Sequence, residues 1–289
     1  MRRLAALLLV LGLAGCTTVF FQPSSAIVAT PGQYGIDYRP VEISAADGTG
    51  LFAWFMPARG QAKATVLYLH GNAENISTHF ANVAWMPAAG FNVLALDYRG
   101  YGGSAGKPTL AGVQLDIDAA MRTLLERPDV DPERILIFGQ SLGGALAIYY
   151  AAHSKYRSHV RAVIADSAFA DYRLVAREKL ADVPLTWAFQ WLPKYLIDDD
   201  YSPQAAVAAI SPIPLLLIHG ERDGIVPLHH SELLFEAAQE PKALWRIPDV
   251  GHIQALREAP VRKRLAEFMQ SHCCEAPAQL TLIAPKTPR

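Results

Sequence analysis

Short apolar segments rich in β-branched and aromatic residues recur along the chain, and most are separated by segments whose apolar positions follow a helical period. The apolar segments span 64–71, 91–100, 134–141, 160–169, 214–223 and 242–252. Helical spacing is clear at 112–126 and 228–239. Strands that are apolar along their whole length and alternate with helices predict a parallel sheet covered on both faces.

Two further segments extend this picture of alternating strands and helices. Strand-like runs flank Asp47-Gly48 within 41–58, which predicts a hairpin. Residues 170–211 separate two predicted strands by far more than the dozen or so residues that a crossover needs. We interpret 170–211 as a helical cap inserted near the site. Trp187 and Trp191 are spaced to share one helical face, and they either line a substrate pocket or pin the cap to the body.

The chain begins with an export signal rather than with a structural element. Arg2 and Arg3 precede an apolar run from Leu4 to about Leu13, which is too short to be a transmembrane helix. The run ends in Leu-Ala-Gly-Cys at 13–16, which resembles the lipobox of bacterial lipoproteins. The other interpretation is a plain secretory signal with a chance cysteine.

The lipobox resemblance implies cleavage before Cys16 and attachment of a diacylglyceryl group to that cysteine. Two acyl chains suffice for stable membrane anchoring. Thr17, a neutral residue at the following position, implies sorting to the outer membrane of the cell envelope, facing the periplasm. We therefore expect a signal peptide at 1–16, a tether at 17–39, a folded domain at 40–272 and a flexible tail at 273–289.

Charge and cysteine content exclude several other classes of protein. The formal net charge is −1, and no cluster of Lys and Arg forms the basic face that nucleic-acid binding requires. Cys273 and Cys274 are adjacent, a spacing at which cysteines rarely pair, and they lie in no metal-ligand pattern. We therefore predict no disulfide, no metal site and no nucleic-acid partner.

A Gly-x-Ser-x-Gly pattern lies where the strand predicted at 134–141 turns into a helix. Ser141 occupies its centre, and Gly139 and Gly143 flank it. A sharp strand-to-helix turn forces the serine into a strained backbone conformation and requires small neighbours. The turn also exposes the hydroxyl group at a helix N-terminus, where developing negative charge is favoured. Ser141 is therefore the candidate nucleophile.

A serine nucleophile needs a base and an orienting carboxylate, and both candidates follow predicted strands. Asp223 ends one apolar segment and His252 ends the next, giving the chain order Ser, Asp, His. Asp166, at the end of an earlier strand, is the competing carboxylate because some enzymes place the acid there. Asp249 is interpreted as a solvated turn residue.

The oxyanion of a tetrahedral intermediate requires two hydrogen-bond donors. We assign one to the backbone N–H of Leu142, directly after the nucleophile, and the other to Asn72 in the loop "HGNAEN" after the strand at 64–71. His70 precedes the nucleophile in the chain and His219 lies within a predicted strand. We therefore expect these two histidines to be structural.

These motifs together resemble the small esterase-like and thioesterase-like branch of the α/β-hydrolase superfamily. The resemblance rests on "HGNAEN", on "DYRGYGGSAGKP" after the next strand and on the Gly-x-Ser-x-Gly elbow, and it covers about 40–270. It implies an eight-stranded, mostly parallel sheet with an antiparallel second strand, a Ser-Asp-His triad and no cofactor.

The function expected from these residues is hydrolysis of a small-molecule carboxylic ester or thioester through an acyl-enzyme intermediate. Peptide or amide hydrolysis is an alternative, because amides and esters pass through the same tetrahedral intermediate. A third hypothesis is an envelope binding protein that kept the fold without catalysis.

Overall fold

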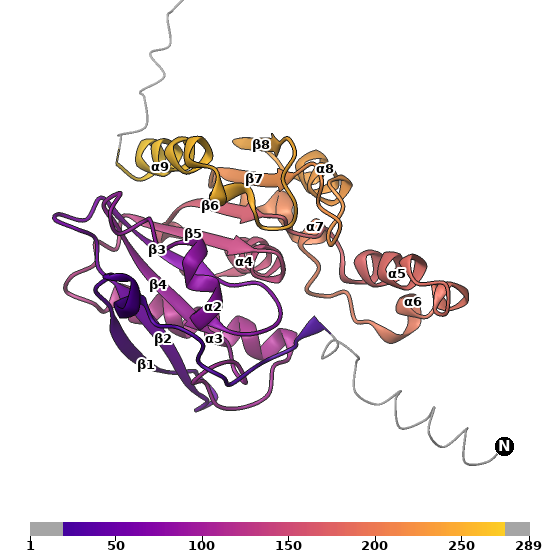
Figure 1. The fold of residues 1–289 in the computed structure, drawn as a ribbon, viewed down its shortest axis with the longest axis horizontal. Coiled ribbons are helices and arrows are strands. Elements are labelled where there is room, and N and C mark those ends of the chain that lie inside the picture. Colours follow the sequence, from indigo (N-terminus) through magenta and orange to yellow (C-terminus); the bar gives the residue numbers. More distant parts are fainter. Residues whose placement is uncertain (1–19, 275–289) are drawn as a thin grey trace, which may run out of the picture.

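A single eight-stranded sheet organises the protein, and the computed structural model describes residues 20–274 of the chain. The strand order is β1-β2-β4-β3-β5-β6-β7-β8 (Figure 1). The strands are β1 (Arg39–Ser44), β2 (Gly50–Met56), β3 (Ala64–Leu69), β4 (Phe91–Asp97), β5 (Ile135–Gln140), β6 (Val160–Asp166), β7 (Leu215–Gly220) and β8 (Lys242–Ile247).

The pairing directions confirm the predicted fold class. β2 pairs antiparallel with both β1 and β4, whereas every other neighbouring pair is parallel. All residues of β3, β4, β5 and β7 are buried. Burial on both faces explains why these strands are mostly apolar instead of alternating between apolar and polar residues.

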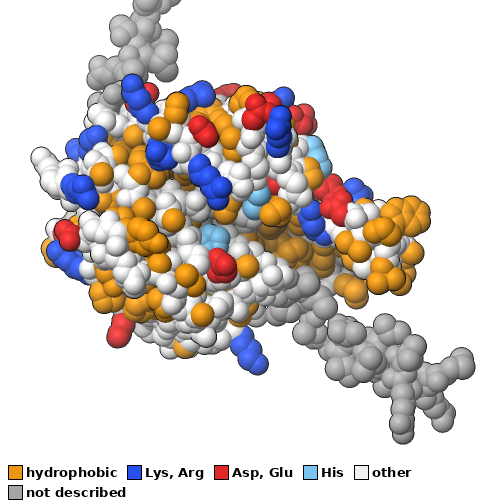
Figure 2. Space-filling view, in the orientation of Figure 1, with side chains coloured by type: hydrophobic (Ala, Val, Ile, Leu, Met, Phe, Trp, Pro, Cys, Tyr) orange, Lys and Arg blue, Asp and Glu red, His pale blue; other side chains and the backbone are white. Residues whose placement is uncertain are grey.

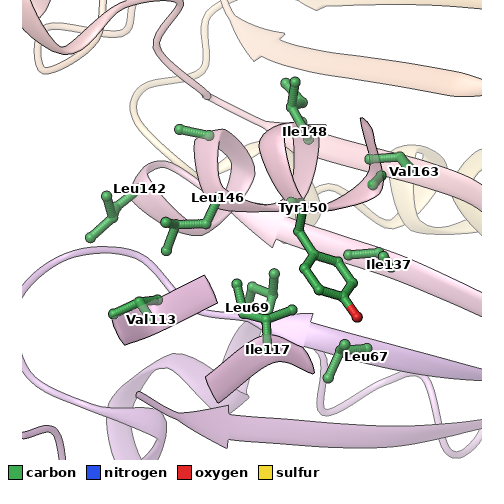
Figure 3. Packing of buried hydrophobic residues seen from close by; sticks show 14 of the residues in the cluster. Leu67, Leu69, Val113, Ile117, Ile137, Leu142, Leu146, Ile148, Tyr150 and Val163 are labelled. Carbon is green, nitrogen blue, oxygen red and sulfur yellow. The ribbon is translucent and has the colours of Figure 1, made fainter. Parts of the chain in front are cut away.

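Helices cover both faces of the sheet, and successive strand residues point to opposite layers. In β3, Leu67 and Leu69 belong to one hydrophobic cluster, whereas Val66 and Tyr68 belong to the other. Figure 3 shows the first cluster, where α3 and α4 pack on the strands. The α-helices are α2 (Ile76–His79), α3 (Leu110–Leu125), α4 (Leu142–His153), α5 (Tyr172–Asp182), α6 (Pro193–Leu196), α7 (Pro203–Ala206), α8 (His229–Ala237) and α9 (Ala259–Cys274).

The insertion predicted at 170–211 contains two parts with different surroundings. α5, a 3₁₀ helix at Trp187–Phe189 and α6 project from the body as the cap (Figure 1). α7 and the 3₁₀ turn after it pack against α4, so they belong to the body. The prediction that Trp187 and Trp191 share one helical face is wrong. Trp187 begins a 3₁₀ helix, whereas Trp191 lies in the turn between that helix and α6, which begins at Pro193.

The described part of the predicted tether, residues 20–39, contacts the folded domain. Phe21 is buried, and the Asn75 side-chain amide donates to the carbonyl oxygens of Ser24 and Ala26 at 2.8 and 2.7 Å. The Gly102 N–H also donates to Ser24 O. These backbone groups bond to distant segments of the chain, and such bonds require no periodic pattern in the local sequence. The sequence of this Pro- and Ser-containing stretch is therefore typical of a linker.

The C-terminal boundary also differs from the prediction. α9 continues to Cys274, and the side chain of Cys273 is buried. The prediction that Cys273 and Cys274 stay unpaired is wrong, because the structure joins them in a disulfide. Cys16, the rest of the signal segment and residues 275–289 lie outside the described residues. Within residues 20–274, no helix has the length and apolar character needed to cross a membrane.

Candidate active site

Ser141 lies at a strained turn between β5 and α4. Its φ of +54° and ψ of −118° are unusual for a residue with a side chain. A Cβ on Gly143 would lie 2.1 Å from Leu69 O, and a Cβ on Gly139 would lie 2.1 Å from Gly143 O. The two glycines therefore permit the close backbone approach that holds the serine in this conformation.

We predict that Gly143→Ala lowers the free energy of unfolding by about 3 kcal/mol or more, because the added methyl group overlaps backbone atoms that cannot rotate away. Gly224→Ala is the matched control, since a Cβ at Gly224 meets no atom within 4 Å. Its effect should stay below about 1 kcal/mol. Urea unfolding of both variants measures the difference, and equal values would contradict the packing argument.

His252 connects the two other candidate catalytic side chains in one hydrogen-bonded chain. Its Nε2 lies 2.9 Å from Ser141 Oγ, and its Nδ1 lies 2.7 Å from Asp223 Oδ2. A carboxylate can only accept, so Nδ1–H donates to Asp223 and Nε2 accepts the serine hydroxyl. This tautomer is the one that general-base catalysis by a histidine requires.

The Asp223 carboxylate is buried and held by several donors. Burial raises its pKa, but hydrogen bonds from His219 and His252 outweigh burial and leave the pKa well below its ordinary value. The N–H groups of Ile225 and Val226 donate to Oδ1 at 2.8 and 2.9 Å. Asp223 is therefore ionised and oriented toward His252.

The competing carboxylate, Asp166, has different partners. It is fully buried, which raises its pKa, and it accepts a hydrogen bond from the Gln140 side chain at 2.8 Å. The carboxylate within hydrogen-bonding distance of His252 is that of Asp223. The solvated Asp249 pairs with Arg222 at the surface.

The two predicted oxyanion donors lie on the loops that meet at Ser141. Leu142 is the first residue of α4, and a Cβ on Gly71 would lie 3.5 Å from Ser141 Cβ, so the loop containing Asn72 lies beside the nucleophile. The Asn72 side chain is already engaged, because Oδ1 accepts from the N–H groups of Gln22 and Ala73. Among the hydrogen bonds between described residues, neither the Leu142 nor the Asn72 backbone N–H is used.

A buried polar network next to the candidate nucleophile was missed by the sequence analysis. The Tyr68 hydroxyl donates to Gln140 Oε1 at 2.6 Å, and Gln140 Nε2 donates to Asp166. Ser167 Oγ lies 3.3 Å from Asp166 Oδ1 and accepts the N–H of Ile253, the residue after the candidate base His252. The available signal was the presence of Tyr68 and Gln140 within otherwise apolar strands.

His70 and Asp97 form a second buried pair, next to the loop of Asn72. Burial lowers the pKa of His70 to about 3 and raises the pKa of Asp97 to about 7. His70 Nδ1–H donates to Gly71 O at 2.7 Å, and Asp97 Oδ1 accepts the N–H of Ile76 at 2.9 Å. These contacts fix both ends of the loop, so His70 has the structural position expected for it.

The raised pKa of Asp97 gives stability a testable pH dependence. The unfolded carboxyl ionises near 3.8 and the folded one near 7, so stability is lost as the pH rises between these values, by up to about 4 kcal/mol. His70 has the opposite slope, because its pKa is lowered. We therefore expect wild type to lose stability relative to Asp97→Asn over this range. Urea unfolding at several pH values tests it, and a constant difference would contradict it.

Trp187 and Trp191 do not form the walls of an enclosed pocket. Their side chains are 64 % and 59 % exposed, and they lie on the part of the cap that projects from the body. A wall of an enclosed apolar pocket would be largely shielded from water. The position of these two tryptophans therefore requires another explanation.

One group of His and carboxylate side chains within residues 20–274 has the spacing of a metal site: Glu178, His229 and His230. The Ala170 N–H donates to His230 Nδ1 at 3.1 Å, so His230 Nε2 carries the proton and donates to Glu178 at 3.0 Å. A metal ion would need the Nε2 lone pair. The donor set therefore fits a hydrogen-bonded clamp between α5 and α8 better than a metal ligand set.

Comparison with known proteins agrees with this fold. A family model described as "Serine aminopeptidase, S33" matches residues 60–208. The protein YfhR of Escherichia coli K12 is 42 % identical over 262 residues, which cover 87 % of this chain and 86 % of YfhR. Human alpha/beta hydrolase domain-containing protein 17B is 31 % identical over 226 residues, which cover 77 % of this chain and 72 % of that protein.

A solved structure with the same architecture is the Pyrococcus furiosus esterase Pf2001. It is 26 % identical in sequence, with a TM-score of 0.69, and the match covers 87 % of this chain and 100 % of the esterase chain. The matched family model, the sequence relatives and the sheet topology lead to one conclusion. The chain belongs to the serine aminopeptidase S33 family of α/β-hydrolases.

Proposed function

We propose that this α/β-hydrolase cleaves carboxylic esters or thioesters of small molecules through an acyl-enzyme intermediate on Ser141. The observation that carries the proposal is the hydrogen-bonded chain from Ser141 Oγ through His252 to Asp223. Its geometry provides the nucleophile, the base and the orienting carboxylate of nucleophilic acyl transfer.

The reaction uses these three side chains together with two backbone N–H groups. His252 Nε2 takes the hydroxyl proton while Ser141 Oγ attacks the acyl carbon, and the N–H groups of Leu142 and Asn72 stabilise the oxyanion. His252 then gives its proton to the leaving alcohol or thiol. Water, activated by the same histidine, attacks the acyl-enzyme and releases the carboxylic acid. Asp223 stabilises the imidazolium formed in each half-reaction.

Covalent labelling with a fluorophosphonate tests the proposal, because only an activated serine reacts rapidly with this probe. We expect mass spectrometry to locate the label on Ser141 in wild type and to find no label in His252→Ala. A folded wild-type protein that does not label would favour a binding protein without catalysis.

Peptide or amide hydrolysis is the second candidate, and the description of the matched family model favours it. An ester, a thioester and an amide that share one acyl group separate the two candidates. Higher kcat/KM for the ester and thioester than for the amide supports the main proposal. Comparable or higher kcat/KM for the amide would make the protein an amidase or peptidase instead.

We also propose that Cys16 carries a diacylglyceryl group that anchors the protein to the outer membrane, facing the periplasm. Support comes from the basic start, the short apolar run and the Leu-Ala-Gly-Cys sequence that ends it. Intact-mass measurement of the chain purified from membranes tests this anchor. A mass without the lipid would contradict it.

A further inference from the structure

Large hydrophobic side chains are concentrated on the outer part of the cap. Of the twelve that are exposed in residues 20–274, seven lie within fourteen consecutive residues. Figure 2 shows hydrophobic side chains gathered on the cap where it projects from the body. We call this set the cap patch; it consists of Val183, Leu185, Trp187, Phe189, Trp191, Tyr195 and Leu196.

The cap patch has the composition of a surface that meets a lipid bilayer. A contiguous apolar surface of more than a few hundred Å² marks an interaction site in a soluble domain. Leu185 is 85 % exposed and Tyr195 is 71 % exposed, so these side chains cover little of the protein itself. Tryptophan and tyrosine are the residues enriched at the boundary between headgroups and acyl chains.

The described chain starts at the base of the cap. The Phe20 ring lies 4.9 Å from the ring of Tyr172, the first residue of α5, and 6.3 Å from that of Phe169. Figure 1 shows this start of the chain on the side from which the cap projects. Three residues lie between Cys16 and Phe20, so the four steps along the chain span at most roughly 14 Å. α5 leads from the Phe20 contact toward the patch, with a rise of roughly 16 Å.

We propose that the cap patch inserts into the surface of the bilayer that holds the lipid on Cys16. The inference rests on the lipid anchor proposed above, because that anchor places a bilayer within reach of the cap. Insertion would give the protein a second membrane contact and would fix the orientation of the cap, and hence of the neighbouring site, toward membrane-borne acyl groups.

Apolar contact rather than charge drives this insertion. The residues in and next to the patch carry both signs, with Lys194 within it and Asp182 and Asp198 beside it. A mixed set of charges gives no strong preference for anionic lipids. We therefore expect little effect of salt on the insertion. A second copy of the chain is the competing occupant of the patch.

Tryptophan quenching in the lipidated protein tests the proposal. The full chain, produced with its own signal and purified from membranes, is reconstituted into phosphatidylethanolamine–phosphatidylglycerol vesicles with brominated acyl chains, which quench tryptophans inside the bilayer. We expect part of the wild-type fluorescence to be quenched and this part to be lost in Trp187→Phe/Trp191→Phe. The substitutions preserve the apolar surface and remove only the reporters. Trp245→Phe, at a buried tryptophan, is the control and should keep the quenched part.

Each remaining outcome has a defined meaning. An equal quenched fraction in wild type and in Trp187→Phe/Trp191→Phe overturns the insertion. Absence of quenching together with crosslinked dimers overturns it in favour of a second copy. An intact mass that lacks the lipid contradicts the proposed anchor and therefore also overturns this inference. Ester hydrolysis by the same sample tests the catalytic proposal separately.

Discussion

Replacing Ser141 with alanine is expected to lower kcat by a factor on the order of 10⁶, leaving only the rate supported by binding and the oxyanion donors. The loss is this large because, among residues 20–274, Ser141 Oγ is the side-chain atom within hydrogen-bonding distance of His252 Nε2, at 2.9 Å. Turnover of the best ester found in the substrate comparison, measured with wild type and variant at equal concentration, gives the ratio. Retention of most of the activity would assign the nucleophile to another residue.

A second substitution at the same position separates catalysis from folding. Alanine keeps a Cβ and therefore keeps the strained backbone, whose φ is +54°. Ser141→Gly relieves that strain, so we expect it to be as inactive as alanine but more resistant to urea by about 1 kcal/mol. A glycine variant that is less stable than wild type would mean that the turn carries little strain.

Replacing Asp223 with asparagine is expected to lower kcat by about 10⁴-fold while leaving the fold intact. The asparagine amide can donate to His252 Nδ1, which moves the histidine proton to Nε2. Nε2 then cannot accept the proton of Ser141, with which it is paired in the wild-type protein. Steady-state kinetics on the same ester measures the loss.

Asp166→Asn is the matched control, because Asp166 is the other carboxylate that the sequence offered at a strand end. Its side chain accepts from Gln140, and asparagine can accept the same hydrogen bond. We therefore expect kcat to change by less than about tenfold. If Asp166→Asn is as damaging as Asp223→Asn, the simple three-residue assignment fails and the buried network takes part in catalysis.

The sheet and the positions of the candidate catalytic residues were predictable from the sequence. β3, β5 and β7 are buried on both faces, so each appears in the sequence as a mostly apolar run. In a parallel sheet the carboxyl ends of the strands meet at one edge. Ser141, Asp223 and His252 follow three such ends, and their order along the chain therefore predicted their meeting in space.

Features that depend on contacts between distant segments were not predictable in this way. The sequence around Ser24 is typical of a linker, yet the carbonyl oxygen of Ser24 accepts hydrogen bonds from Asn75 and Gly102. Tyr68 and Gln140 lie in two mostly apolar strands, and they can form a hydrogen bond only because β3 and β5 are neighbours in the sheet.

The sequence by itself determined the fold class and placed Ser141, His252 and two candidate carboxylates at strand ends, because strand patterns and chain order can be read directly from it. Only the tertiary structure decided which carboxylate meets His252 and which way the cap exposes its aromatic residues. The sequence around Trp187 does not show whether its side chain lines a pocket or faces outward, and in the structure the side chain is exposed. Its surroundings are set by how the 3₁₀ helix and α6 pack against α5, and the spacing of residues along the sequence does not specify which side chains those contacts cover.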